Sequence, residues 1–157
     1  MRYYMIDRIT EFEHGKRVRG LKAVSYESEV LHDHFPGYPV LPGALLVEGM
    51  AQLSGFLLEM TFNTKEEVRR ALLVKIDEAK FYSMAEPGDC LVLEATLGEQ
   101  MKDAMKTNIL VMCGAKKVAT ATLTFVLKDI PMPEIHEQRR SLYRVWTRTC
   151  QNVPEIW

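Results

Sequence analysis

The longest hydrophobic stretch of the chain covers residues 44–60 and predicts a single helix. Pro42 stands where a proline can open a helix without losing an internal hydrogen bond. The helix would be about 27 Å long with apolar side chains on all sides, so we expect burial on most faces. The polar exceptions are Glu48, Gln52, Ser54 and Glu59. Glu59 falls at the helix end, where water is available, whereas Glu48 lies one turn inside, where an unpartnered charge is costly.

Alternating apolar and polar positions predict strands in much of the remaining chain. They cover residues 72–84, 90–100, 107–113 and 117–127, and a looser alternation covers residues 16–26. Short turn segments separate the four later stretches, which indicates antiparallel strands joined by short loops. One long apolar helix followed by such strands predicts an α+β domain, in which a curved antiparallel β-sheet wraps the central helix.

The composition changes after Leu127, where Pro131 and Pro133 end the last strand. Residues 134–149 suggest a short helix with three arginines on one face, Arg140, Arg144 and Arg148. We therefore divide the chain into a domain of residues 1–128 and a C-terminal extension of residues 129–157, a short helix plus tail. The arginine stripe is either a solvated basic face or a docking surface for an acidic partner.

Composition narrows the class of protein. A chain of 157 residues that is 47% hydrophobic fits one domain with a sizeable core. Its 20 basic and 21 acidic residues nearly balance, which argues against nucleic acid as the main partner. The N-terminus lacks the apolar region of a signal peptide, and the apolar helix is too short and interrupted for a membrane span. We expect a soluble, cytoplasmic protein with no membrane partner.

The segment before the central helix combines a histidine with a stiff loop. Residues 34–43 read HFPGYPVLPG, and the Pro and Gly residues in it restrict the backbone geometry. His34 and Glu48 form a candidate general acid–base pair, because burial shifts the pKa of such groups toward use near neutrality. Gly43 opens the helix, so its N–H has no acceptor inside the helix and suits a carbonyl that gains negative charge. Gln52 follows Glu48 by one turn and can hold its carboxylate through a hydrogen bond.

Two alternatives remain from the residues alone. The histidine and the carboxylate can be core polar groups that found partners without any catalytic role. The run His32, Asp33 and His34 also suggests a metal, but a metal site needs three or four ligands, and His14 and His136 are not convincingly placed. The three cysteines, Cys90, Cys113 and Cys150, are far apart and fit reduced thiols better than a disulfide framework or a zinc site. We expect no metal and no cofactor.

The segment HFPGYPVLPGALLVEGMAQ resembles the signature of the β-hydroxyacyl-acyl-carrier-protein dehydratases of the FabZ type, which have the hot-dog fold. The likeness runs from Tyr4 to about Leu127, roughly four-fifths of the chain. The family's catalytic histidine matches His34, its catalytic carboxylate matches Glu48, and its carbonyl-polarising backbone amide matches Gly43. The resemblance implies an obligate homodimer with active sites at the interface, which in some relatives assembles further into a hexamer, a trimer of dimers.

The chemistry that this resemblance implies is a dehydration in fatty acid or related acyl or polyketide biosynthesis. The substrate would be a (3R)-3-hydroxyacyl thioester on the phosphopantetheine arm of an acyl carrier protein, and the product a trans-2-enoyl thioester. His34 would remove the proton next to the carbonyl while the Gly43 N–H stabilises the enolate-like oxygen. Glu48, from the other subunit, would position and protonate the departing hydroxyl. In the alternative account, His34 performs both proton transfers and Glu48 only orients.

Further positions follow from the same resemblance. Phe35, Pro42 and Gln52 would support the catalytic groups, and the candidates for the substrate tunnel are Tyr38, Leu41, Phe81 and Tyr82. Tyr82 stands where an arginine is common, so a basic contact to the carrier protein is missing there, and the stripe of Arg140, Arg144 and Arg148 could replace it, because carrier proteins are acidic. Two other functions stay open: a hot-dog acyl thioesterase, and a non-catalytic subunit that binds an acyl group or a carrier protein.

Overall fold

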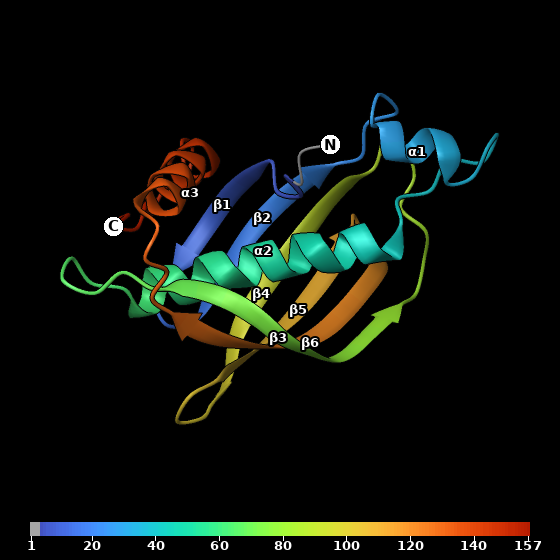
Figure 1. Cartoon of the computed structure of the whole chain (residues 1–157). Helices are drawn as coiled ribbons and strands as arrows, with labels where there is room; N and C mark the ends of the chain where they lie inside the picture. The colour runs from blue at the N-terminus through green and yellow to red at the C-terminus, as the bar shows by residue number, and fades with distance from the viewer. Residues whose placement is uncertain (1–3) are drawn as a thin grey trace.

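Six antiparallel strands form one sheet that curves around a long helix (Figure 1). The structure is a computed structural model and describes residues 4–157. In chain order the strands are β1 (Arg8–Glu13), β2 (Arg17–Ala23), β3 (Arg70–Phe81), β4 (Cys90–Gln100), β5 (Met105–Cys113) and β6 (Lys116–Lys128). Their order across the sheet is β1-β2-β4-β5-β6-β3. The predicted α+β architecture of a central helix wrapped by an antiparallel sheet is confirmed.

The central helix, α2 (Gly43–Phe62), forms the middle of the core. Its side chains Met50, Leu53 and Leu57 are fully buried, as the uniformly apolar sequence predicts. Among the described residues α2 is also the one helix long and apolar enough to cross a membrane, but 72% of that window is buried inside the fold. The helix is therefore the core helix of a soluble domain. A short helix, α1 (Glu29–Asp33), precedes it and was not expected from the sequence pattern.

Strand β3 lies at one edge of the sheet and follows one flank of α2. It begins at Arg70, two residues before the expected start at 72. It ends at Phe81, three residues before the expected end at 84. A Cβ built on Gly55 would lie 3.7 Å from Ala71 near the start of the strand, and one built on Gly43 would lie 3.0 Å from the Phe81 ring near its end. The strand leaves several apolar side chains exposed, with Leu72 at 41%, Val74 at 55% and Ile76 at 50%. This edge is therefore unusually apolar for a surface.

The C-terminal helix, α3 (Pro133–Trp146), packs back onto the core beside α2 (Figure 1). Its Tyr143 ring meets Phe56 of α2 edge to face at 4.8 Å between centroids. The Tyr143 hydroxyl donates to Glu59 Oε2 at 2.9 Å, and Arg70 Nη1 donates to the same oxygen at 2.6 Å. Glu59 is 1% exposed, so the expectation that water surrounds it is wrong. The extension folds over this end of α2 and replaces the water with an ion pair and a phenol.

A second set of hydrogen bonds fastens the start of α3 to the sheet. Arg70 Nε donates to Nδ1 of His136 at 3.0 Å, and Nε2 of His136 donates to the carbonyl oxygen of Ile130 at 2.7 Å. Because the guanidinium can only donate and the carbonyl can only accept, the imidazole carries its proton on Nε2. His136 is thus a structural residue that joins α3 to the buried ion pair.

Candidate active site

The position of His34 fixes the tautomer of its ring. The residue follows α1 and is half-buried, and its Nδ1 lies 3.0 Å from the carbonyl oxygen of Val40. A carbonyl oxygen can only accept, so Nδ1 carries the proton and the lone pair of the neutral ring is on Nε2. The ring of Phe35 stacks on the imidazole with 4.3 Å between centroids, which supports its orientation. The arrangement presents Nε2 as a proton acceptor.

The loop after His34 is held by its own backbone hydrogen bonds. Phe35 and Tyr38 exchange two of them, at 2.9 and 2.8 Å, and the Val40 N–H donates to the His34 carbonyl oxygen at 2.8 Å. Gly37 has φ of 77°, a conformation that only glycine adopts without strain. Leu41 N–H donates to the carbonyl oxygen of Ala85 at 2.8 Å, which ties the loop to the segment after β3. The imidazole and the start of α2 are therefore held in a fixed relation.

Gly43 is the first residue of α2 and lies close to the ring of Phe81. Pro42 caps the helix, and its carbonyl oxygen accepts from the N–H of Leu46 at 3.1 Å. The Gly43 N–H has no acceptor within the helix and stands at the positive end of its dipole. A Cβ at this position would lie 3.0 Å from the Phe81 ring, so a larger residue would require the ring to shift by a few tenths of an ångström. The absence of a side chain at Gly43 therefore allows the close approach of Phe81, which brings this tunnel candidate to the start of α2.

Glu48 is positioned by a relay of two hydrogen bonds. Gln52 Nε2 donates to Glu48 Oε1 at 2.8 Å, and the N–H of Met5 donates to Gln52 Oε1 at 3.0 Å. The first bond is the one that the four-residue spacing predicts. The second joins the N-terminal segment to the helix and orients the amide of Gln52. The carboxylate is thus held in place by residues from two segments.

The Glu48 carboxylate faces a cavity of about 370 Å³ that the sequence did not reveal. The cavity is lined by Tyr4, Glu48, Gln52, Ile135, Gln138, Arg139 and Leu142. His34 does not line it, so the single chain does not bring the two groups of the predicted pair into this cavity. Four of the lining residues come from α3. The sequence held one signal for their position, the spacing of the apolar residues Ile135, Leu142 and Trp146, which marks the inward face of that helix.

The other predicted site residues have separate surroundings. Tyr38 is exposed, and its hydroxyl donates to Glu86 at 3.2 Å. Tyr82 lies on the surface near β6, where its hydrogen bond with Thr120 and the charge of Lys117, 4.1 Å above the ring, hold the pKa of its phenol below the usual value. Leu41 packs against the core.

The basic residues of α3 divide between its two faces. Arg140, Arg144 and Arg148 are all exposed to solvent. The helix ends at Trp146, three residues before the predicted limit of 149, so Arg148 lies in the turn that follows it. Arg139, in contrast, points inward, with its guanidinium 5.8 Å from the centre of the Tyr143 ring. Within residues 4–157 no group of three His, Cys, Asp or Glu side chains could hold a metal ion.

The fold matches solved structures of the hot-dog class. One is a hot-dog-like protein from Thermanaerovibrio acidaminovorans, with a TM-score of 0.63, 19% identity and coverage of 82% of this chain and 93% of that one. Another is smu.793 from Streptococcus mutans, solved bound to acetyl CoA, with a TM-score of 0.64, 18% identity and the same coverage. At these identities the likeness concerns the fold alone.

Sequence comparison then gives the family. The FabA-like domain matches residues 1–122, and the 3-hydroxyacyl-[acyl-carrier-protein] dehydratase FabZ of Thiobacillus denitrificans is 35% identical over 130 residues, 82% of this chain and 90% of that protein. The chain therefore belongs to the FabA-like family of hydroxyacyl-carrier-protein dehydratases. Helix α3 lies beyond the part that the family describes.

Proposed function

We propose that this protein is a 3-hydroxyacyl-[acyl-carrier-protein] dehydratase, a lyase that removes water from a (3R)-3-hydroxyacyl thioester to form the trans-2-enoyl thioester. The observation that carries the proposal is the tautomer of His34. The Val40 carbonyl leaves Nε2 as a base, and the stiff loop joins that base to the Gly43 amide at the start of α2. The relatives named FabZ dehydratases support the same chemistry.

Each group has a step that suits its geometry. Nε2 of His34 takes the proton from the carbon next to the thioester carbonyl. General base catalysis requires the base to lie within hydrogen-bond reach of that proton. The Gly43 N–H donates to the carbonyl oxygen as negative charge develops on it. Glu48, oriented by Gln52, holds the hydroxyl on the third carbon and gives it a proton, so the C–O bond breaks and water leaves. In the alternative account, the protonated His34 gives its proton to the hydroxyl and Glu48 only orients it. The substrate itself arrives on the phosphopantetheine arm of an acyl carrier protein, so the reaction needs no resident cofactor.

The working unit of this proposal is a homodimer in the cytoplasm, in fatty acid or related acyl biosynthesis. Within one chain His34 does not line the cavity of Glu48, so a shared site needs a second copy. The apolar edge of β3 offers a surface for that copy, since exposed apolar edge strands pair with other chains. Phe81, at the end of this strand, already contacts Gly43, so the edge and the candidate site adjoin. A hexamer of three dimers remains the further possibility.

The direct test follows enoyl absorbance after mixing the protein with a 3-hydroxyacyl thioester. We expect turnover by the wild type and a loss of about 10²- to 10⁴-fold in His34→Ala and in Glu48→Ala, the usual range for removing an acid–base group. His32→Ala is the matched control, because His32 is an exposed histidine two residues away whose Nε2 lies 3.1 Å from the carbonyl oxygen of Tyr26, in the loop before α1.

The same assay separates the other two functions. Release of free thiol without enoyl absorbance would indicate a thioesterase and would contradict the proposal. Binding of the thioester without either product would indicate a non-catalytic subunit. Wild-type turnover that persists in both alanine variants would also contradict the assignment of His34 and Glu48.

A further inference from the structure

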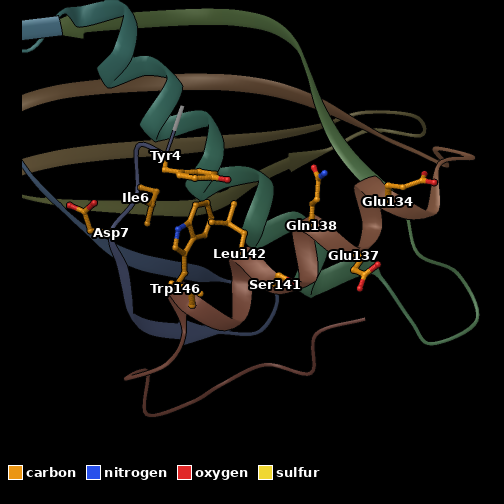
Figure 2. Close-up of a pocket in the computed structure, with 10 residues that line it drawn as sticks. Tyr4, Ile6, Asp7, Glu134, Glu137, Gln138, Ser141, Leu142 and Trp146 are labelled. Atoms are coloured by element: carbon orange, nitrogen blue, oxygen red, sulfur yellow. The ribbon is translucent and has the colours of Figure 1, made fainter. Parts of the chain in front are cut away.

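A groove runs between α3 and the N-terminal segment that precedes β1. Its volume is about 770 Å³, and its apolar lining comes from Tyr4, Ile6, Leu142, Val145 and Trp146. Figure 2 shows the rings of Tyr4 and Trp146 grouped with Leu142, whereas Glu134 and Glu137 point away from them at the other end of α3. One end of the groove is therefore hydrocarbon-like, and the acidic side chains lie at the opposite end.

This groove adjoins the cavity of Glu48. Tyr4, Gln138 and Leu142 line both spaces, so the two are separated by no more than these shared side chains. Glu48 and Gln52 line the second space. Each volume falls within the range of about 300–1,000 Å³ that is typical of small-molecule sites. The apolar groove is therefore the space next to the cavity that Glu48 lines.

The charges near the apolar end do not favour an ionic ligand. Asp7 is the acidic group there, and its carboxylate accepts from Lys22 Nζ at 2.9 Å and from the N–H of Ala23 at 2.7 Å. Its charge is therefore already matched within the chain. An uncharged, flexible hydrocarbon is the ligand that this lining suits best, because it gains from leaving water and needs no polar partner.

We propose that the groove holds the tail of the substrate's acyl chain, with α3 as one wall of a subsite. This rests on the proposed dehydratase function, in which the thioester carbonyl lies at Gly43 and the third carbon at Glu48. The carbons after the third then continue past Glu48 into the groove. Because α3 begins at Pro133 and the family match ends at residue 122, this wall is an addition to the shared family domain.

The subsite predicts a preference for long chains. Each methylene that leaves water should raise affinity about threefold to fourfold, until the groove is full. The KM of the wild type should therefore fall steadily from a 3-hydroxybutyryl to a 3-hydroxydecanoyl thioester. Both substrates are offered as pantetheine thioesters, so that contacts of a carrier protein do not contribute.

The variant Ser141→Phe tests the subsite, because Ser141 is an exposed residue that lines the groove. A phenyl ring there should occupy space that the chain needs. We expect KM to rise at least tenfold for the decanoyl substrate and less than twofold for the butyryl substrate, with kcat unchanged for both. Thr149→Phe is the matched control, because Thr149 is a small exposed residue near the end of α3 that does not line the groove. Equal changes for both substrates, or none, would overturn the proposal.

A binding measurement separates this proposal from the dehydratase reaction itself. Trp146 lines the groove, and Trp157→Phe leaves it as the one tryptophan of the chain. The probe is an unreactive S-alkyl pantetheine thioether with bromine at the end of a ten-carbon chain. We expect saturable quenching of Trp146 fluorescence that Ser141→Phe weakens at least tenfold and Thr149→Phe does not. Quenching without any turnover by the wild type would support the acyl groove and contradict the proposed dehydratase function. Absence of quenching would contradict the acyl groove, even if turnover is found.

Discussion

Glu59 and Arg70 place a charged pair inside the core, at 1% and 2% exposure. Such a pair is stable only when its remaining hydrogen-bonding groups are satisfied. Here the carboxylate accepts from Arg70, from the Tyr143 hydroxyl and from the N–H of Ala71, and the guanidinium also donates to His136. Three elements, α2, β3 and α3, therefore meet at this ion pair, which makes the docking of α3 specific in position.

Tyr143 gives this cluster a pH dependence. Complete burial, and next the nearby charge of Glu59, raise the pKa of its phenol well above the usual value. The unfolded chain ionises at about pH 10, while the folded chain keeps the proton, so this contribution to stability is full below pH 10 and declines above it. We expect Tyr143→Phe to lose about 1.5–3 kcal/mol at pH 7, the value of a hydrogen bond to a charged group, and to show a smaller further loss between pH 9 and 11.

Urea denaturation at pH 7, 9 and 11 measures both effects. Tyr26→Phe is the control, because Tyr26 is 62% exposed. An identical alkaline loss in Tyr143→Phe and in the wild type would show that the phenol is not the responsible group.

At the scale of elements, α3 presents different faces to the core and to solvent. Its inward face carries Tyr143, Trp146 and Arg139. Its outward face carries Arg140 and Arg144 of the arginine stripe, and Arg148 follows in the turn after the helix. We keep the proposal that this stripe docks the acidic carrier protein, since exposed charges of one sign steer an oppositely charged partner. Two of the three arginines stand on a helix that is fixed to the core, and the third follows one turn later, which gives the stripe a defined position.

Reversing all three charges to Glu should weaken carrier-protein binding by at least tenfold at low salt, and the difference should shrink as salt is raised, because salt screens exposed charges. Titration of a labelled acyl carrier protein at several ionic strengths measures this. The control reverses three exposed lysines away from α3, Lys65 and Lys102 in loops and Lys128 at the end of β6, with the same change in net charge. Equal weakening in both variants would mean that net charge alone matters.

Strand and helix positions could largely be predicted from the sequence, because burial on one face imposes a period on the side chains. The strands at residues 90–100 and 117–127 and the central helix were found in this way and lie within a residue or two of β4, β6 and α2. The short helix α1 and strand β1 were missed, since five or six residues carry too little periodicity. Both ends of the edge strand β3 were predicted wrongly. Apolar side chains on its exposed face obscure the alternation of apolar and polar residues in its sequence.

At the scale of the whole molecule, the single chain is an incomplete site. The base at His34 and the carboxylate at Glu48 belong to different surroundings, and the apolar edge of β3 lacks a neighbouring strand on one side. A dimer joined along that edge would cover the edge and supply the second half of each site. This arrangement predicts that two variants, each inactive alone, regain activity when they form mixed dimers.

Mixing His34→Ala with Glu48→Ala under conditions that allow subunit exchange should restore activity. If exchange is random, half of the dimers are mixed and each has one intact site of two, which gives about a quarter of wild-type activity. Enoyl absorbance before and after exchange measures this. Each variant mixed with itself is the control, and no recovery in the mixed dimers would place both groups in one subunit.

The sequence by itself determined the α+β class, the core helix and the chemical identity of the candidate groups, because periodicity and a stiff Pro- and Gly-rich loop are local properties. Even the hydrogen bond between Gln52 and Glu48 followed from helical spacing. Only the tertiary structure decided which groups meet across long sequence separations. It buried Glu59 against Arg70 and Tyr143, and it brought α3 to the cavity of Glu48, because packing of an all-round apolar helix draws distant segments together in ways that no local pattern encodes.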